Sequence, residues 1–293
     1  MKKLLYTLLF VPLALFGQEN YSLSFDGVND FVDIGIPIGM NPTGSHTFLL
    51  FSKNQTEPCI AGMLISEHLG TNMTPPNNIF SYGYRACETN CPEGNCMAMD
   101  FYANSVYTTS YYGDNWDYWA FVYNAITLER KIYLNGVLLA DDIASGAYQG
   151  TFDLIFGAQD YNMPPGMVSY FNGFIDDVSL WAHPLSIDEI QSYMSSCING
   201  NEFGLIGHWN FNEGFGDTIY DISLNGNHGI RNGPTYSNDS HGNNCSGCKN
   251  PDATNYDENA IEEDEQLCIY SQEYVHGLWN EVDDGAIEYE YLQ

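Results

Sequence analysis

Residues 172–181 read NGFIDDVSLW, and this stretch decides the fold. Apolar and β-branched residues that alternate around a polar pair are typical of a β-strand. Strict alternation places Asp176 on the same face as three apolar residues, Phe174, Val178 and Leu180. If that face is turned to the core, the Asp176 carboxylate needs backbone donors or a cation, because an uncompensated buried charge is costly.

A second acidic stretch, residues 22–32 (SLSFDGVNDFV), opens the chain after its first segment. Apolar residues alternate with serines up to Asp26, which is the period of a half-buried strand. Gly27 then permits a tight turn that carries Asn29 and Asp30. Both stretches are therefore predicted to be strands that hold carboxylates where apolar residues are usual.

The same period continues through much of the chain. Residues 119–123 alternate, residues 131–139 contain an Asn-Gly hairpin turn, and residues 151–156 form another apolar run. Many short strands with almost no helix predict an all-β fold, a two-sheet antiparallel sandwich. Residues 56–97, which are rich in Cys, Pro and Asn, are expected to be an insertion.

One short helix is predicted after Leu185. Ser186 and Glu189 have the spacing of a capping box, in which each side chain bonds the other residue's backbone amide. Ile187, Ile190 and Met194 follow at helical spacing and share a face. We expect this helix to pack on the edge of the sandwich.

The first 18 residues have the pattern of a secretory signal peptide. Lys2 and Lys3 precede an apolar run from Leu4 to Phe16, which is too short for a membrane-spanning helix of about 20 residues. We therefore expect a secreted or cell-surface protein with no membrane insertion. The formal net charge of −30 also excludes nucleic acid as a partner, because phosphate binding requires Lys and Arg.

Eight cysteines in an exported chain are expected to form disulfides. Their positions favour two local bridges within the insertion, a bridge within a small module at 245–270, and a fourth long-range pair. The insertion holds Cys59, Cys87, Cys91 and Cys96; the favoured module bridge is Cys248 with Cys268; and Cys197 with Cys245 is the favoured fourth pair among the 105 pairings that eight cysteines allow. A zinc site in the insertion is the less favoured alternative, since no His is suitably spaced. Residues 271–293 form an acidic tail or linker.

Taken together, residues 24–32, 119–123, 132–136, 173–178, 185–186 and 189–190 resemble, in this order, the bacterial LamG-like, concanavalin A-like jellyroll domains. The resemblance covers roughly residues 20–195 and implies a domain over 19–240. Residues 204–237 resemble the start of another such domain. They either complete the first sandwich or form a truncated repeat, and completion is favoured because an isolated pair of strands is barely stable.

The resemblance implies that the two acidic stretches lie side by side, often around a structural calcium. Calcium takes six to eight oxygen ligands from carboxylates and carbonyls. The predicted ligands are Asp26, Asn29, Asp30, Asp176 and Asp177. The alternative is that turn amides bond the Asp176 carboxylate and no metal binds.

A ligand-binding surface is predicted before the strand at residue 119. Aromatic rings there would stack on sugars while carboxylate and amide groups bond hydroxyls. The candidates are Tyr111, Tyr112, Asp114, Asn115 and Trp116. The alternative is that these rings are part of the core.

No catalytic residue is predicted. The Glu-x-Asp-x-x-Glu strand of jellyroll glycosidases has its nearest match at residues 281–286, which lacks the final Glu. We therefore expect a non-catalytic recognition or adhesion module for a polysaccharide or a surface glycoprotein. The alternatives are a glycoside hydrolase, or an accessory domain of a polysaccharide-degrading enzyme, and a structural cell-surface protein.

Overall fold

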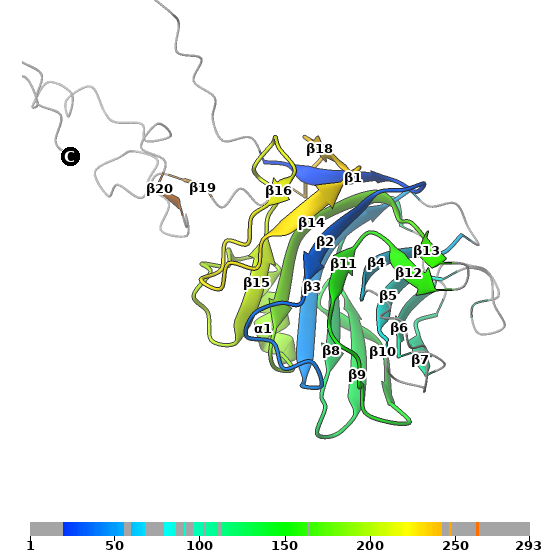
Figure 1. The fold of residues 1–293 in the computed structure, drawn as a ribbon. Helices are drawn as coiled ribbons and strands as arrows, with labels where there is room; N and C mark the ends of the chain where they lie inside the picture. The colour runs from blue at the N-terminus through cyan, green and yellow to red at the C-terminus, as the bar shows by residue number, and fades with distance from the viewer. Residues whose placement is uncertain are drawn as a thin grey trace, which may run out of the picture. The chain divides into compact units, whose positions relative to one another are not determined.

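The computed structural model describes residues 20–55, 60–67, 79–85, 91, 96–101, 104–109, 113–162, 165–241, 246–247 and 262–263. Residues 20–241 belong to one compact unit, and residues 246–247 and 262–263 to another. The first unit is built from two antiparallel sheets packed face to face (Figure 1). The predicted jellyroll sandwich is thus confirmed.

The first sheet, sheet A, has eight strands within the described residues. In spatial order these are β10 (Val137–Ile143), β9 (Glu129–Leu134), β8 (Trp116–Tyr123), β3 (His46–Asn54), β14 (Asn172–Trp181), β1 (Ser22–Asp26) and β18 (Thr235–Ser237), and β15 (Leu205–Trp209) also pairs with β14. The Asn135-Gly136 turn between β9 and β10 has positive φ angles of 49° and 74°, as its sequence predicts.

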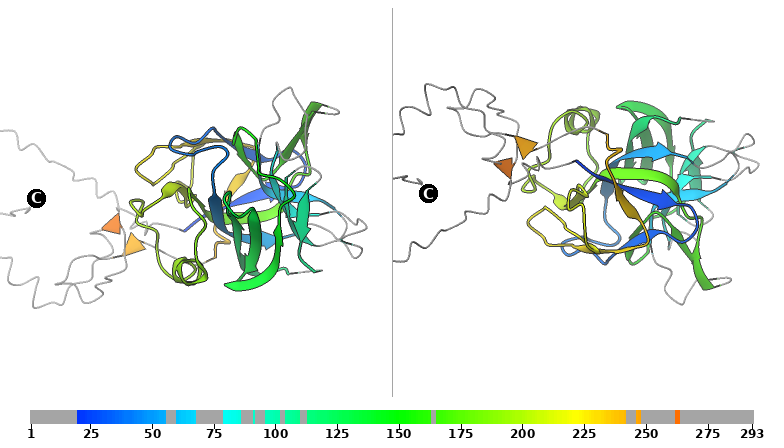
Figure 2. Two further views of the ribbon diagram at one scale, coloured as in Figure 1. Left: turned by 90° about the horizontal axis from the view of Figure 1, so that it is seen from below. Right: turned by 90° about the horizontal axis from the view of Figure 1, so that it is seen from above.

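The second sheet, sheet B, also has eight described strands. In order they are β16 (Thr218–Ile219), β17 (Gly229–Asn232), β2 (Phe31–Gly35), β11 (Leu154–Phe156), β4 (Gly62–Glu67), β5 (Ser81–Tyr84), β6 (Met97–Asp100) and β7 (Ser105–Tyr107). Two further pairs are β12 (Gln159–Asn162) with β13 (Pro165–Val168), and β19 (Ser246–Gly247) with β20 (Glu262–Glu263). Figure 2 shows the two layers of the sandwich from below and above.

The main core lies between the sheets and is strongly aromatic. Phe48, Tyr82, Trp119 and Phe121 are fully buried there, each from the inward face of its strand. Alternation of apolar and other residues along each strand is what turns these rings to one side. Large rings fill the space between the sheets with few side chains.

A second apolar cluster covers part of the outer face of sheet A. The helix α1 (Ile187–Tyr193) places the buried Ile190 against it, with Leu49, Tyr118 and Trp181 from the strands. Ser186 and Glu189 form the predicted capping box. The helix packs on the face of the sheet and not on its edge, because the outer face carries the apolar residues that need cover.

The strict alternation predicted for residues 172–181 is wrong, because β14 contains a bulge. The pairing with β3 shifts between Asp176 and Ser179, and Asp177 has a φ of +46°. One extra residue at a bulge moves every later side chain to the other face. Ile175 and Val178 therefore both reach the main core, while Asp176 lies on the outer face opposite Phe51.

The bulge lies where β14 changes its neighbour. One edge of β14 pairs with β1 over residues 172–175 and with β15 over residues 178–181. Of the two alternatives for residues 204–237, the described strands add to the one sandwich. β15 joins sheet A, β16 and β17 extend sheet B, and β18 pairs with β1.

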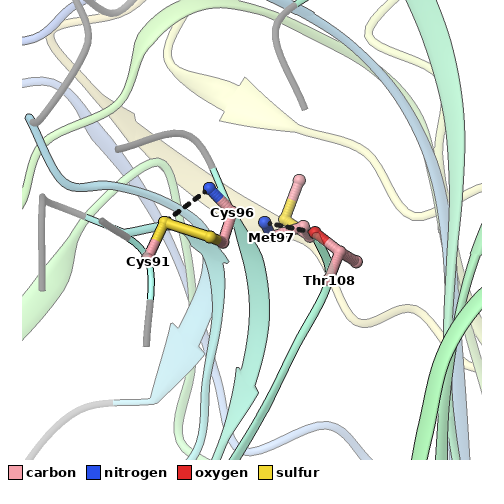
Figure 3. Close-up of a disulfide and its surroundings, with 4 residues drawn as sticks. All are labelled: Cys91, Cys96, Met97 and Thr108. Atoms are coloured by element: carbon pink, nitrogen blue, oxygen red, sulfur yellow. Dashed lines mark hydrogen bonds between the residues drawn. A yellow bond between two sulfur atoms is a disulfide. The ribbon is translucent and has the colours of Figure 1, made fainter. Parts of the chain in front are cut away.

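A disulfide joins Cys91 to Cys96 beside the start of β6 (Figure 3). The Cys96 amide also donates to Cys91 Sγ, and the Met97 amide donates to Thr108 Oγ1 at 2.9 Å. This bridge is local to the insertion, as expected for two of its four cysteines. Cys197 is disulfide-bonded as well.

Several predictions fall outside the described residues. These are the signal peptide at 1–18, Cys59, Cys87, the bridges that involve Cys245, Cys248 and Cys268, and the tail at 271–293. Where the structure describes the chain, none of its helices combines the length and the apolar character that a membrane span requires.

Candidate functional site

One row of side chains crosses the outer face of sheet A from strand to strand. Trp116 of β8 pairs with Lys53 of β3, which pairs with Phe174 of β14. Phe174 pairs with Ser24 of β1, and Ser24 pairs with Thr235 of β18. Directly paired residues share a face, so these five residues form a continuous row, here called the outer strip.

Every residue of the outer strip retains some exposed surface. Thr235 is exposed and the other four residues are partly exposed. The Trp116 and Phe174 ring centroids lie 6.2 Å apart, and Lys53 Nζ lies 5.8 Å from the Phe174 centroid. Partly exposed rings beside a cation form an apolar surface with a hydrogen-bond donor at its centre.

The segment 238–241, which follows β18, holds this surface in place. Asp239 accepts from Lys53 Nζ at 2.8 Å and from Trp116 Nε1 at 3.0 Å, so one carboxylate orients both residues. The hydrogen bond from Lys53 lowers the pKa of Asp239. The backbone of Asp239 is held by Ser22, whose hydroxyl donates to the Asp239 carbonyl at 2.7 Å.

The carboxylates of Asp176 and Asp177, at the bulge of β14, bind the end of segment 238–241. Asp176 accepts from the amides of Asp177 at 2.9 Å and His241 at 3.3 Å. Asp177 Oδ2 lies 2.8 Å from His241 Nε2, and its Oδ1 lies 3.4 Å from His208 Nε2. Burial raises the pKa of Asp176, the nearby Asp177 charge raises it further, and burial lowers the pKa of His241.

The carboxylates of Asp26 and Asp30, at either end of the turn between β1 and β2, have a separate, local role. Asp26 Oδ1 accepts from the amides of Val28 at 2.8 Å and Asn29 at 3.4 Å, which closes the turn after β1. Asp30 is buried and accepts from the Asp26 amide at 2.9 Å. Burial raises the pKa of Asp30. Asn29 is exposed at the turn.

The five predicted calcium ligands do not converge on one point. Asp26 pairs with Asn172, and Asp176 lies four residues further along β14, or about 13 Å away. Within the described residues, no group of three or more His, Cys, Asp or Glu side chains is arranged to hold a metal ion. A single site shared by Asp26 and Asp176 does not fit this register. Calcium binding by either group alone stays a prediction.

The predicted ligand-binding residues fall partly on the outer strip. Trp116 is a member of it, and Asp114 and Asn115 are exposed immediately before β8. Tyr111 and Tyr112 lie outside the described residues.

Another carboxyl group with a strongly raised pKa lies inside the sandwich. Glu67 is 2% exposed, and burial raises its pKa to about 9. Its Oε2 accepts from the Phe152 amide at 3.3 Å. A neutral carboxyl group that holds a backbone segment in the core has a structural role.

Sequence reasoning missed most of the outer strip. Lys53 stands out only as a cation within the apolar strand HTFLLFSKN, and Phe174 shares its parity with Asp176. Asp239 follows no readable pattern, since residues 237–244 are uniformly polar. His208 and His241 are brought to Asp177 only by the pairing of β15 and the course of segment 238–241.

Part of the chain matches a known protein-family model. Residues 92–191 match the family model of the concanavalin A-like lectin/glucanases superfamily. A search of curated proteins found no match to this sequence. The matched range runs from the Cys91–Cys96 bridge to α1 and includes Trp116 and Phe174.

One of the similar solved structures shares the fold at low sequence identity. A Bacteroides ovatus ATCC 8483 protein, named for a suggested carbohydrate-binding role, is similar over 74% of this chain and 59% of its own, with a TM-score of 0.58 and 16% identity. This chain thus spans about three fifths of that protein's length. A Limulus polyphemus SAP-like pentraxin gives 0.45 and 12% identity over 61% of this chain and 83% of its own. The CBM40 of the Ruminococcus gnavus IT-sialidase gives 0.42 and 16% over 58% and 96%.

Proposed function

We propose that this concanavalin A-like domain is a carbohydrate-binding module whose site is the outer strip. The observation that carries the proposal is the pair of partly exposed rings, Trp116 and Phe174, on either side of Lys53. Aromatic faces stack on the apolar faces of sugar rings, and Lys53 and Asp239 supply a donor and an acceptor for hydroxyls. The shared fold with the Bacteroides ovatus protein supports this choice of ligand class.

Preorganisation supports the same proposal. Trp116 is held by its Nε1 bond to Asp239, and the Asp239 backbone is held by Ser22. An anchored ring loses little conformational freedom when a ligand stacks on it, so more of the contact energy contributes to affinity. The protein would act as a secreted, non-catalytic module for a polysaccharide or for the glycan of a surface glycoprotein.

A glycan array followed by titration calorimetry tests the proposal on the full chain. Trp116→Ala is expected to weaken glycan binding at least about tenfold, because buried Trp contacts dominate such interfaces. Phe203→Ala is the matched control, since Phe203 is 91% exposed and lies away from the strip. The affinity of this variant for the glycan should be unchanged. Equal effects of both variants, or the absence of any glycan ligand, would reject the proposal in favour of a structural surface protein.

The hydrolase alternative has its own readout. A module that only binds leaves an oligosaccharide ligand intact during long incubation. Release of new reducing ends by the purified chain, in proportion to its concentration, would establish an enzyme instead.

Calcium is a separate proposal. If a structural calcium contributes to the fold, EDTA lowers the melting temperature and added calcium restores it, because a ligand of the native state stabilises it by mass action. If the carboxylate of Asp26 or of Asp176 binds the calcium, EDTA should no longer lower the melting temperature of its alanine variant, Asp26→Ala or Asp176→Ala. Identical melting curves with and without EDTA would leave the backbone amides as the partners of these carboxylates.

A further inference from the structure

We infer that the outer strip takes an internal stretch of a neutral, linear polysaccharide, which lies across the strands with successive sugars over successive strands. This inference rests on the proposed function and adds the ligand's class and direction. It follows from the length of the row, the change of chemistry along it and the charges around it.

The row is long enough for several sugar units. It crosses β8, β3, β14, β1 and β18 without a missing pair. Neighbouring strands lie about 4.8 Å apart, which is close to the advance per unit of an extended pyranose chain. Thr235 is exposed on the edge strand β18, so the row continues to the margin of the sheet, and an internal stretch fits it better than a chain end does.

The chemistry changes from one end of the row to the other. Trp116 and Phe174 offer ring faces for stacking, whereas Ser24 and Thr235 offer hydroxyl groups that donate and accept. A ligand of one or two sugars needs only the aromatic end. A longer ligand also reaches the hydroxyl end and gains hydrogen bonds there.

The surrounding charge selects against acidic glycans. Lys53 is the cation of the row, and it is already paired with Asp239. Asp26, Asp114 and Asp177 lie on the same face or at its end, in a chain of net charge −30. An anionic polysaccharide would meet uncompensated repulsion, so the ligand is neutral and its binding should depend little on salt.

Calorimetry with oligosaccharide ladders of two to six units tests this inference. The probes are cello-, manno-, xylo- and laminari-oligosaccharides, with oligogalacturonates as the anionic series. For one neutral series the dissociation constant is expected to fall at least about tenfold between the dimer and the tetramer, and the anionic series should not bind.

Variants at the two ends separate this inference from the proposed function. Ser24→Ala combined with Thr235→Ala should weaken tetramer binding several-fold and leave dimer binding unchanged, while Trp116→Ala weakens both. Thr127→Ala, which removes an exposed hydroxyl from the turn before β9, is the control. Binding that does not depend on length, or an equal loss for dimer and tetramer in the double variant, overturns the cross-strand placement and leaves the carbohydrate-binding module standing. If only the oligogalacturonates bind, the inference of a neutral ligand fails and the carbohydrate-binding module stands. If neither the ladders nor any glycan of the array binds, both proposals fail.

Discussion

Single carboxyl groups in this protein are stabilised in different ways. Asp176 and Asp26 accept hydrogen bonds from backbone amides, and Asp239 accepts hydrogen bonds from two side chains. Glu67 lies in the core. Low exposure raises the pKa of a carboxyl group, and a bonded cation lowers it. A carboxyl group therefore closes a turn, orients a tryptophan or stays protonated, according to its neighbours.

Glu67 makes stability depend on pH. Burial raises its pKa from 4.5 to about 9, so between those values the folded state holds a proton that the unfolded state has lost. Stability from this group is therefore complete below pH 4.5 and declines as pH rises towards 9. Glu67→Gln should remove this decline, and chemical denaturation of both proteins between pH 5 and 9 measures it. A constant difference in unfolding free energy across that range would contradict the prediction.

At the scale of elements, α1 depends on its cap and on its cover of sheet A. Ser186 Oγ accepts from the Glu189 amide and the Glu189 carboxylate accepts from the Ser186 amide, which satisfies two helix N-terminal donors. Only Ile190 of this short helix is buried, so its packing area is small. Tyr193 also stacks on Trp181 at 4.6 Å between ring centroids, so the cap and this packing together hold the helix in place.

Ser186→Ala should lower the free energy of unfolding by about 1 kcal/mol, the usual cost of losing a Ser cap. Denaturant titration measures the change. Ser195→Ala is the control, because its hydroxyl makes only an exposed 3.4 Å bond after the helix. A loss of equal size in the control would show that the effect does not come from the cap.

At the scale of the whole molecule, a buried arginine joins the two sheets. Arg130 of β9 has no exposed side-chain surface and pairs with Asp142 of β10 through two bonds of 2.9 and 2.6 Å. It also donates to carbonyls of Asn104 and Met99, which belong to the β6–β7 region of sheet B. Its guanidinium lies 5.0 Å from the Phe101 ring centroid.

Arg130→Met should destabilise the fold by about 3 kcal/mol, because it leaves Asp142 and the sheet B carbonyls without their donor. Lys131→Met is the matched control at the next position. Lys131 makes only a 3.8 Å contact with Glu129 at the surface, so its loss should change stability by about 0.5 kcal/mol or less. Thermal and denaturant unfolding of the pair test this, and similar losses in both would argue against a bridging role.

Local patterns predicted the elements well and the site only in part. The β1 strand, the Asn135-Gly136 hairpin and the capping box of α1 depend on residues within a few positions of one another, so the sequence reveals them. The parity of β14 was wrong after Asp176, because a bulge depends on which strands pair there. Trp116 was recognised, whereas Lys53, Phe174 and Asp239 were not.

The sequence by itself determined the fold class, since period-two alternation and turn residues are local signals that survive without any long-range contact. It also determined that carboxylates are placed within strands. Only the tertiary structure decided what those carboxylates touch. Register brings Asp26 to Asn172 and segment 238–241 to the face of sheet A, so Asp176 and Asp177 hold that segment while Asp239 orients Trp116. Pairing register and long-range backbone course arise from the whole packed molecule, and no short stretch of the chain encodes them.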